Sequence, residues 1–242
     1  VVSVYWLMPG SIRIYVVMLS TLLLLGFKSP ESAVILICYS IATYVLMRGE
    51  TISGIRTIVA LAFVLGVLAW FKIRFFDAGG RAGDIVENVA IPLGLSYYSF
   101  LCAHFIIERY RNTLEHPRFR DYLAYLFSLP TIVVGPINRF QEFIDEAKSV
   151  TWSASQISNG LERLLFGYFK VAVLGDVLVG GQLGDLAASV AQTNEPLSLY
   201  LTIVKDGLRL YFLFSGFSDI AIGFGLLLGI RVLENFTWPV LC

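Results

Sequence analysis

The chain of 242 residues contains few charged residues, few histidines and few cysteines. Charged residues make up 15% of it, whereas about a quarter is typical of soluble domains. Its 18 basic and 18 acidic residues cancel, so no excess positive charge supports nucleic-acid binding. Three scattered cysteines and two histidines are too few for a disulfide framework or a metal site. Glycine-rich phosphate loops, zinc-ligand spacings and nucleophile elbows are also missing from the sequence.

Apolar residues dominate instead. Hydrophobic residues make up 57% of the chain, and its mean hydropathy is +0.74. At about 20 apolar residues per membrane span, the length has room for roughly seven helices. We therefore expect an all-α polytopic transmembrane helix bundle, organised as a single membrane-embedded domain over residues 1–242. Because the sequence begins at Val1 and stops at Cys242, we also expect a segment of a longer protein, truncated at both ends.

The first half of the chain predicts plain membrane helices. Apolar runs at about 12–27, 32–47 and 55–71 are expected to act as scaffold, and a charged loop is expected at 72–87. A fourth span is predicted at 88–107. Counted over the first five predicted spans, one side would carry seven basic residues and the other six. That count does not fix the orientation of the protein in the membrane.

Broken and interfacial helices are predicted farther along. The run at 122–134 is short for a full span and contains Pro130, which favours a broken or re-entrant segment. Residues 142–159 are expected to be polar and exposed. At 161–179 we expect a helix that lies at the interface or packs in the bundle, with Gly160 and Gly167 on one face. A glycine-rich loop is expected at 180–195, and Pro196 should open the last helix.

The stretch 206–239 is apolar but carries polar residues inside it. An ionised side chain in the hydrocarbon region costs several kcal/mol unless it faces protein or water, so this stretch should face a wet interior. Helical spacing places Ser215 with Asp219, and Gly216 with Gly223, on shared faces. Lys205, Asp206 and Arg209 are spaced to neutralise one another. For Asp219 either a partner elsewhere or a wet tunnel remains open.

Two glycines near the end of this stretch have the spacing of a helix-packing motif. Gly225 and Gly229 are four residues apart, which is a small-xxx-small pair. Such a pair allows another helix to approach closely. We therefore predict a helix contact at these two positions.

Three motifs in order resemble the membrane-bound O-acyltransferases. They are the proline-glycine-serine-aromatic run at 92–100 with Tyr110-Arg111, Gly135-Pro136-Ile137 with Arg139, and the run at 211–223 followed by Glu234-Asn235-Phe236. Within the family they are most similar to the bacterial branch that acetylates alginate and other polysaccharides or moves D-alanine onto teichoic acid. Leu101, Glu108 and Leu213 replace a frequent Gln, a frequent Asp and a frequent Asp of that branch.

The resemblance implies a reaction. An acyl group, most simply acetyl, would pass from a thioester donor such as acetyl-CoA or an acyl-carrier protein to a hydroxyl of an extracytoplasmic polysaccharide or cell-envelope polymer. The protein would cross the bacterial cytoplasmic membrane several times, among membrane lipids. Its partners would be the polymer acceptor and an acyl-donor or extracytoplasmic transferase protein, with no bound cofactor.

The resemblance also assigns site residues. The family's catalytic histidine lies in a Trp-His region after the Asn-Phe motif, so it is expected beyond Cys242, and the segment alone is expected to be inactive. No catalytic residue or metal ligand is assigned within it. Candidates to line a tunnel or substrate path are Tyr211, Ser215, Ser218, Asp219 and Asn235. Candidates for a structural or loop role are Pro92, Gly94, Gly135, Pro136 and Arg139.

Neither histidine of the chain matches the family's motif. His104 lies in an apolar run and is expected to be buried and hydrogen-bonded to a neighbouring helix, whereas His116 is expected in solvent. Two other functions stay open. Charges within the membrane and a proline-broken span also suit a transporter or channel. A non-catalytic membrane scaffold is the third possibility.

Overall fold

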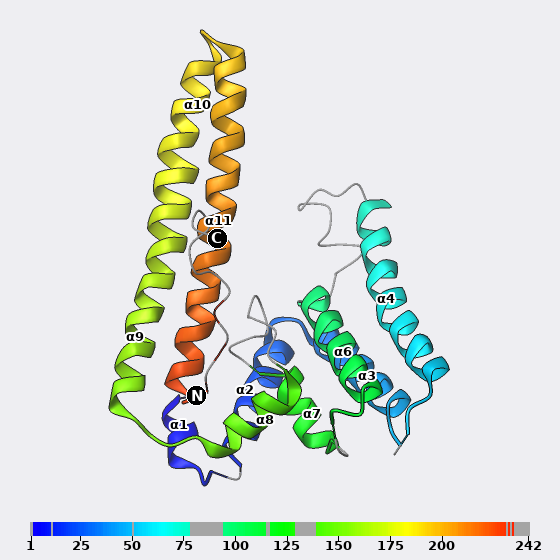
Figure 1. Ribbon diagram of the computed structural model, residues 1–242. Coiled ribbons are helices and arrows are strands. Elements are labelled where there is room, and N and C mark those ends of the chain that lie inside the picture. Colours follow the sequence, from blue (N-terminus) through cyan, green and yellow to red (C-terminus); the bar gives the residue numbers. More distant parts are fainter. Residues whose placement is uncertain are drawn as a thin grey trace. The chain divides into compact units, whose positions relative to one another are not determined.

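A computed structural model describes most of the chain as helices (Figure 1). The described residues are 2–10, 12–49, 51–77, 94–114, 117–128, 139–230, Val232 and Glu234, and no strand occurs among them. This confirms the all-α prediction. The chain divides into two compact units, one made of 1–133 with 137–150 and the other of 134–136 with 151–242. The single membrane-embedded domain stays a prediction.

The first unit is built from short and medium helices. They are α1 (Val2–Leu7), α2 (Arg13–Lys28), α3 (Pro30–Leu46), α4 (Gly54–Asp77), α6 (Leu95–Tyr110), α7 (Phe119–Leu126) and α8 (Phe140–Ser149). Between α2 and α3 the chain turns at Ser29, whose backbone N–H donates to the Leu25 carbonyl at 2.7 Å. Its hydroxyl caps α3 by accepting from the Ser32 backbone N–H at 3.4 Å, and Pro30 fills the first turn.

Aromatic side chains form the core that joins α6, α7 and α8. Phe105 lies with its ring centroid 4.4 Å from that of Tyr122 and 5.5 Å from that of Phe140. Tyr98 meets Phe127 at 5.3 Å. Offset and edge-on pairs of this kind contribute about 0.5–1.5 kcal/mol each beyond the apolar area they bury. The first unit is therefore held together largely by large rings.

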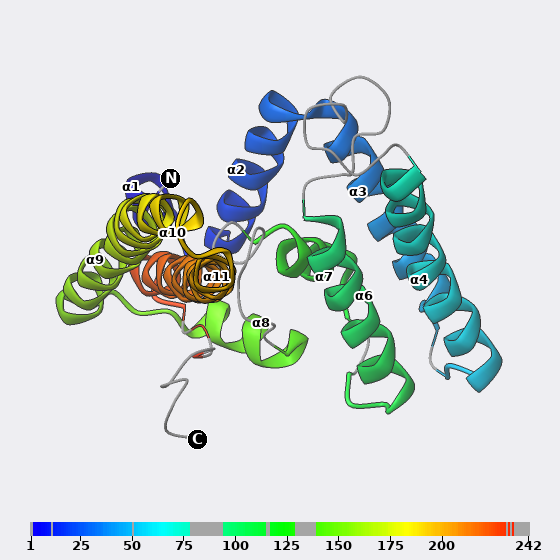
Figure 2. The same cartoon turned by 90° about the horizontal axis from the view of Figure 1, so that it is seen from above.

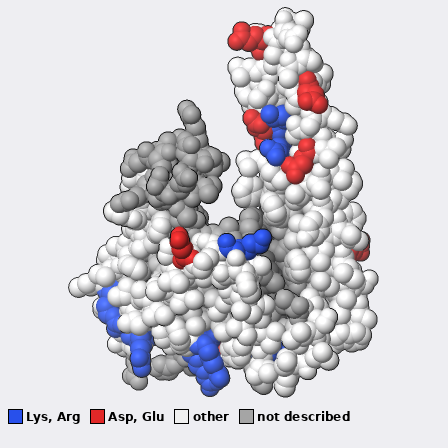
Figure 3. Space-filling view, turned by 180° about the vertical axis from the view of Figure 1, so that it is seen from behind, with Lys and Arg blue, Asp and Glu red and all other residues white. Residues whose placement is uncertain are grey.

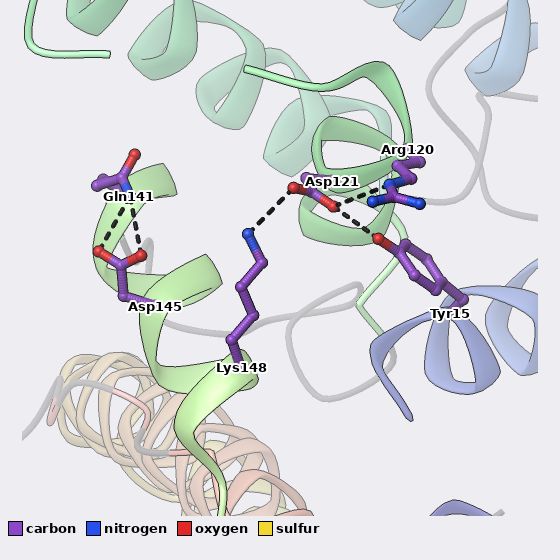
Figure 4. Close-up of polar contacts among 6 residues, drawn as sticks. All are labelled: Tyr15, Arg120, Asp121, Gln141, Asp145 and Lys148. Atoms are coloured by element: carbon purple, nitrogen blue, oxygen red, sulfur yellow. Dashed lines mark hydrogen bonds and ion pairs between the residues drawn. The ribbon is translucent and has the colours of Figure 1, made fainter. Parts of the chain in front are cut away.

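One buried carboxylate is satisfied within this core region. Asp121, in the first turn of α7, is 5% exposed. It accepts a hydrogen bond from the Tyr15 hydroxyl at 2.7 Å and one from Lys148 at 3.3 Å, while the Arg120 Nε lies 3.9 Å away (Figure 4). Both cations are more than half exposed. Its position at a helix N-terminus adds a favourable interaction with the helix dipole.

Two expectations for the first unit were wrong. The chain around 142–149 is not simply exposed, because it forms the amphipathic helix α8. Phe140, Phe143, Ile144 and Ala147 are buried along one face of it at helical spacing. The loop expected from 72 also begins too early, since α4 continues to Asp77.

The predicted break in the segment 122–139 is confirmed, although not at the expected place. Helix α7 already ends at Leu126, and Phe127 and Ser128 follow in a non-helical conformation. One continuous helix through this segment is therefore excluded. The expected helix breakers Pro130, Gly135 and Pro136 lie outside the described residues.

The second unit contains a long helical hairpin. Helix α9 (Ala154–Tyr168) continues into a π-helix, η1 (Phe169–Leu183), and then into α10 (Gly184–Ala191). A short link leads to α11 (Glu195–Leu227), whose first turn contains Pro196, as predicted. The Asn194 side chain caps α11 by accepting from the Leu197 N–H at 3.1 Å. Figures 1 and 2 show that α9 to α10 runs alongside α11.

The loop expected at 180–195 is absent, because helical structure continues through Gly180, Gly181 and Gly184 to Ala191. Glycine is more frequent in membrane helices than in soluble ones, so a glycine cluster is a weaker turn signal in apolar sequence. Helix packing also favours a glycine at position 180. A Cβ there would lie 3.3 Å from the Nε of Arg209 on the facing helix.

Glycines bring α9 and α11 into close contact. The predicted faces are confirmed: Gly160 and Gly167 of α9 lie against Gly223 and Gly216 of α11. A Cβ on Gly167 would lie 2.8 Å from the Gly216 carbonyl oxygen, and one on Gly223 would lie 2.9 Å from the Gly160 carbonyl oxygen. Real Cβ atoms do not approach so closely, so both pairs require glycine. Small residues at a helix interface permit this contact between backbones.

Gly225 and Gly229 do not form the predicted helix-packing pair. They form the end of α11 instead. The Ile230 N–H donates to the Gly225 carbonyl at 2.9 Å, and the Gly229 N–H donates to the Leu226 carbonyl at 3.0 Å. This is a Schellman motif, and its left-handed residue is Gly229, at φ 74°. A Cβ on Gly225 would clash with Val232 of the chain that follows, not with another helix.

Three helical stretches among the described residues are long and apolar enough to cross a membrane. They are Gly54–Ile73, Ala154–Ala191 and Glu195–Leu227, and Pro30–Leu46 is a shorter apolar helix. With its 33 residues, α11 is about 50 Å long at 1.5 Å per residue, longer than the ~30 Å hydrocarbon core. These helices confirm the prediction of an α-helical membrane protein. The number of spans, about seven, stays a prediction.

Candidate functional site

The candidate site is centred on Asp219, about two turns before the C-terminal end of α11, and lies within the second unit. The carboxylate is 5% exposed and lies outside the first and last turns of the helix, so only side chains can compensate its charge. Two cations do so. The Arg163 Nε lies 2.8 Å from one carboxylate oxygen, and the Lys170 Nζ lies 2.5 Å from the other. The predicted burial of Asp219 within the protein is confirmed, and its partner lies on another helix.

The two cations reach Asp219 because of their spacing. Arg163 and Lys170 are seven residues apart, as are Gly160 and Gly167, so all four follow the same face of α9 and the start of η1. The glycines bring the backbones of α9 and α11 together. Arg163 and Lys170, on the same face as the glycines, are thereby placed against α11. The close contact and the ion pairs therefore have one cause in the sequence.

Ser215 completes the contacts of Lys170. It is 1% exposed and accepts a hydrogen bond from the Lys170 Nζ at 3.0 Å. Ser215 and Asp219 are one helical turn apart, and both hold the same ammonium group. Their predicted shared face is confirmed. Lys170 is thus held by an anion and a hydroxyl on successive turns of α11.

Arg163 links Asp219 to the chain after α11. Its Nη2 forms an ion pair with Glu234, which follows the Schellman turn. The Arg163 Nε is close to Asp219 but is not aligned to donate a hydrogen bond to it, so that contact is an ion pair only. Glu234 begins the Glu-Asn-Phe motif, which connects this motif to the Asp219 cluster. We use "Asp219 cluster" for Arg163, Lys170, Ser215, Asp219 and Glu234.

The charges of the Asp219 cluster decide what it can do. Two cations and two carboxylates cancel, and both oxygens of Asp219 already face cations. The side chains of Arg163 and Lys170 keep 35% and 31% of their surface exposed. These two cations are therefore the groups that can meet an anionic ligand or a developing negative charge.

The other candidates from the sequence fall in several places. Ser218 is buried, and Tyr211 is partly exposed, with its ring centroid 5.4 Å from that of Phe212. Gly94 precedes α6 at φ 77°, a left-handed conformation that favours glycine. Arg139 precedes α8 and forms an exposed ion pair with Glu142 at 3.6 Å. The remaining candidates lie outside the described residues: Pro92, Gly135, Pro136 and Asn235.

Sequence reasoning missed the two basic residues of the cluster. Both lie in the helix predicted at 161–179, and their seven-residue spacing, which matches that of Gly160 and Gly167, is the signal that could have identified them. The predicted neutralisation among Lys205, Asp206 and Arg209 is only half right. Lys205 pairs with Asp206 at 3.1 Å, but Arg209 bonds to Asp176 of η1 at 3.0 Å. Figure 3 shows acidic and basic side chains together on an otherwise largely uncharged hairpin.

His104 is one third exposed, not buried as expected, and no hydrogen bond joins it to a described residue of a neighbouring helix. Its Nδ1 lies 3.6 Å from the Oε2 of Glu108, one turn away on the same helix. The same Glu108 oxygen accepts from the backbone N–H of Phe140 at 3.3 Å. His104 therefore belongs to the packing of α6 near α8, in the first unit, and not to the Asp219 cluster. His116 lies outside the described residues.

The chain is similar to bacterial acyltransferases that are named for polymer substrates. It is 31% identical to the probable alginate O-acetylase AlgI of Pseudomonas fluorescens over 189 residues, which are 77% of the chain and 38% of that relative. It is 29% identical to the probable alginate O-acetylase AlgI of Pseudomonas aeruginosa over 204 residues, 77% of the chain and 39% of the relative.

A third relative extends the similarity to another polymer. The chain is 27% identical to the teichoic acid D-alanyltransferase of Bacillus subtilis over 205 residues, 82% of the chain and 51% of the relative. No family model matches the chain. The relatives confirm the resemblance to the membrane-bound O-acyltransferases that the three motifs indicated. The chain spans about two fifths of the length of the alginate O-acetylases it matches.

Proposed function

We propose that this chain is part of a membrane-bound O-acyltransferase, which moves an acyl group, most simply acetyl, to a hydroxyl of an extracytoplasmic polysaccharide or cell-envelope polymer. The observation that carries the proposal is the similarity to alginate O-acetylases and a teichoic acid D-alanyltransferase over 77–82% of the chain. The long apolar helices support a location in the bacterial cytoplasmic membrane, crossed several times. A thioester such as acetyl-CoA or an acyl-carrier protein is the proposed donor.

The chemistry needs a base that the Asp219 cluster does not supply. A hydroxyl is a weak nucleophile at neutral pH, and a general base that takes its proton typically contributes about 10²–10⁴-fold. Asp219 is already paired through both oxygens. By the family resemblance, the proposed base is a histidine that follows the Glu234-Asn235-Phe236 motif. A donor protein or an extracytoplasmic transferase is a proposed partner.

The Asp219 cluster would then stabilise negative charge in the reaction and hold the groups that do so in position. When the hydroxyl attacks a thioester, negative charge develops on the carbonyl oxygen, and a fixed cation near that oxygen lowers the barrier. Lys170 is fixed by Asp219 and Ser215 and is still partly exposed. We propose that Lys170 and Arg163 face the reacting path or an anionic substrate group. Asp219 would be a positioning residue, and Tyr211, Ser215, Ser218 and Asn235 would line the path.

Transfer of label from donor to polymer tests the proposal. Membranes that contain the native protein are supplied with an acyl-labelled thioester and, separately, with alginate or teichoic acid. We expect polymer-bound label, reduced at least about tenfold by Lys170→Met because one fixed cation is lost. Lys148→Met is the matched control, since Lys148 forms an exposed ion pair in the first unit. Solute flux through these membranes without any labelled polymer would favour a transporter and overturn the proposal.

A further inference from the structure

A basic pocket lies in the first unit, apart from the Asp219 cluster. Its volume is about 400 Å³, and it opens where α3 and α6 end. The described residues that line it are Tyr44, Met47, Arg48, Gly49, Arg109, Pro117 and Arg118. Three of these are arginines, and none is an aspartate or glutamate. The pocket is within the size range of sites that hold small molecules.

Arg109, in the last turn of α6, carries a charge that the described contacts do not neutralise. Its side chain is 4% exposed. The Nη1 donates to the Leu114 carbonyl at 2.6 Å, and the Nη2 donates to the Gly49 carbonyl at 2.5 Å. Its Nε is buried and has no hydrogen-bond partner among the residues that the structure describes. Both partners are neutral, and burial lowers the pKa of this guanidinium. A buried cation that meets no anion among the described residues is costly, so this arrangement favours binding of an anion.

Arg48 and Arg118 extend the positive charge to the exposed part of the pocket. No ion pair joins either of them to a described carboxylate. The side chains of Arg48 and Arg118 are also not needed to cap the C-terminal end of α3. Arg56 does so, because it donates to the Leu46 and Arg48 carbonyls at 2.8 and 2.7 Å. Two exposed arginines therefore flank a third that is buried and only partly bonded. Such an arrangement repels cations and concentrates anions.

The position of the pocket favours a phosphate group carried by a lipid. Arginine binds phosphate oxygens with two parallel N–H donors, which makes it the preferred side chain for this group. The pocket lies at the end of α3, a short apolar helix, where a bilayer would present its headgroups. Basic pockets between membrane helices are known to bind anionic headgroups. Tyr44 and Met47 add apolar surface beside the arginines.

We propose that this pocket binds a phosphate group, that of an anionic phospholipid headgroup, between Arg48, Arg109 and Arg118. Arg109 contributes positive charge at the wall of the pocket, and Arg48 and Arg118 close around the phosphate oxygens. The site does not depend on the acyltransferase activity. Its occupancy would fix the turn after α3 against the end of α6, since Arg109 already bonds to Gly49.

Lipid binding by the purified native protein tests the proposal without any assay of acyl transfer. Native mass spectrometry counts bound phosphatidylglycerol and, as a neutral-headgroup comparison, phosphatidylcholine. The variant Arg48→Gln/Arg118→Gln removes only exposed charges and should leave the fold intact. We expect it to bind phosphatidylglycerol roughly 10–100-fold more weakly, because the charge-assisted hydrogen bonds from these two arginines to the phosphate are lost. Arg111→Gln is the matched control, an exposed arginine two residues from Arg109 and outside the lining.

Inorganic phosphate separates a lipid from a soluble ligand. If phosphate alone stabilises the native protein against heat, and the double variant loses this effect while phosphatidylglycerol binding is unchanged, the lipid assignment is overturned. Arg109→Lys provides a second test, because a lysine keeps the charge but loses the planar pair of donors. It should weaken phosphatidylglycerol binding in the same direction. Equal phosphatidylglycerol binding by the double variant and by Arg111→Gln would overturn the site itself.

Discussion

Asp121 in the first unit and Asp219 in the second are both buried carboxylates, each 5% exposed, yet their surroundings differ. Asp121 lies at a helix N-terminus and is bonded to a tyrosine hydroxyl and to cations that are more than half exposed. Asp219 lies about two turns before the C-terminal end of its helix, and its two cations are about two thirds buried. Equal burial of an acid therefore does not mean an equal role.

The difference lies in what replaces water around each carboxylate. The surroundings of Asp121 already favour a negative charge through the helix dipole, a hydroxyl and solvated cations. Those of Asp219 depend on two side chains from the facing helix, brought close by glycines. If Asp219 loses a partner, an uncompensated charge remains between apolar helices. If Asp121 loses a partner, water can take its place. Loss of Asp219 should therefore be the more damaging.

Asp219→Ala should have the largest effect, because it removes the carboxylate that pairs with both Lys170 and Arg163. Breaking a buried ion pair from one side costs about 3–5 kcal/mol, and we expect roughly 2–3 here because both partners keep about a third of their surface. Asp121→Ala should cost about 1–2 kcal/mol. Unfolding of both variants in detergent, followed by circular dichroism, compares the two sites.

The compensated variant Lys170→Met/Asp219→Leu sharpens this test. Replacing both members of a buried pair by apolar residues is often neutral, so we expect much of the lost stability to return. Acyl transfer should not return with it if Lys170 is the working cation. A single variant at Asp219 that is no less stable than Asp121→Ala would contradict the comparison.

Gly167→Ala should have the next largest effect. Its Cβ would lie 2.7 Å from the Ile220 Cγ1 and 2.8 Å from the Gly216 carbonyl oxygen, so α9 and α11 must separate. Overpacking of this kind costs about 1–3 kcal/mol. Gly207→Ala in α11 is the control, since a Cβ there meets nothing within 4 Å. Thermal unfolding of the two variants should differ in sign, because alanine in open space favours the helix.

Tyr15→Phe should have a smaller effect, limited to the first unit. It removes the 2.7 Å hydrogen bond to Asp121 while the ring stays in place. A single hydrogen bond of this kind contributes about 1 kcal/mol. Chemical denaturation of the variant measures this loss, and polymer acylation should stay at the native rate. A large loss of acylation would mean that the first unit also takes part in the reaction.

Lys148→Met should have the smallest effect. Its partner Asp121 is buried, but the Lys148 side chain is 57% exposed. Exposed ion pairs contribute about 0–1 kcal/mol, and salt screens them further. The melting temperature should shift little at low salt and not at all at high salt. A salt-independent shift larger than that of Tyr15→Phe would reverse the assumed order of the two contacts.

Helix type and helix faces were predictable from local pattern. The apolar runs predicted α2 and α3 to within about two residues, and the seven-residue spacing of Gly160 and Gly167 matched that of Gly216 and Gly223. The ionic partners of Asp219 were not predictable from its own segment, because Lys170 lies 49 residues away. The one available signal, the shared seven-residue spacing of the glycines and the basic residues on one face, becomes meaningful only once the facing helix is known.

The errors came from signals that have two meanings. Glycines at 180–184 were read as a loop, but in apolar sequence they also serve helix packing. At Gly225 and Gly229 the reverse occurred, since a packing spacing turned out to be a helix end. Polar residues at 142–149 concealed an amphipathic face, because charged residues flank Phe143 and Ile144 and separate them from Ala147. Local sequence does not say which neighbour a residue will meet.

The short link between Ala191 and Glu195 has a consequence for how the protein is made. A charged residue that enters the bilayer alone costs roughly 2.5–3.5 kcal/mol near the centre of a helix. Two antiparallel helices joined by a tight connection can leave the translocon together, with Lys170 and Asp219 already in contact. The Lys170–Asp219 pair would then cross without a net charge of its own. In that case, the close contact between the glycines of α9 and those of α11 contributes to membrane insertion before it contributes to any chemistry.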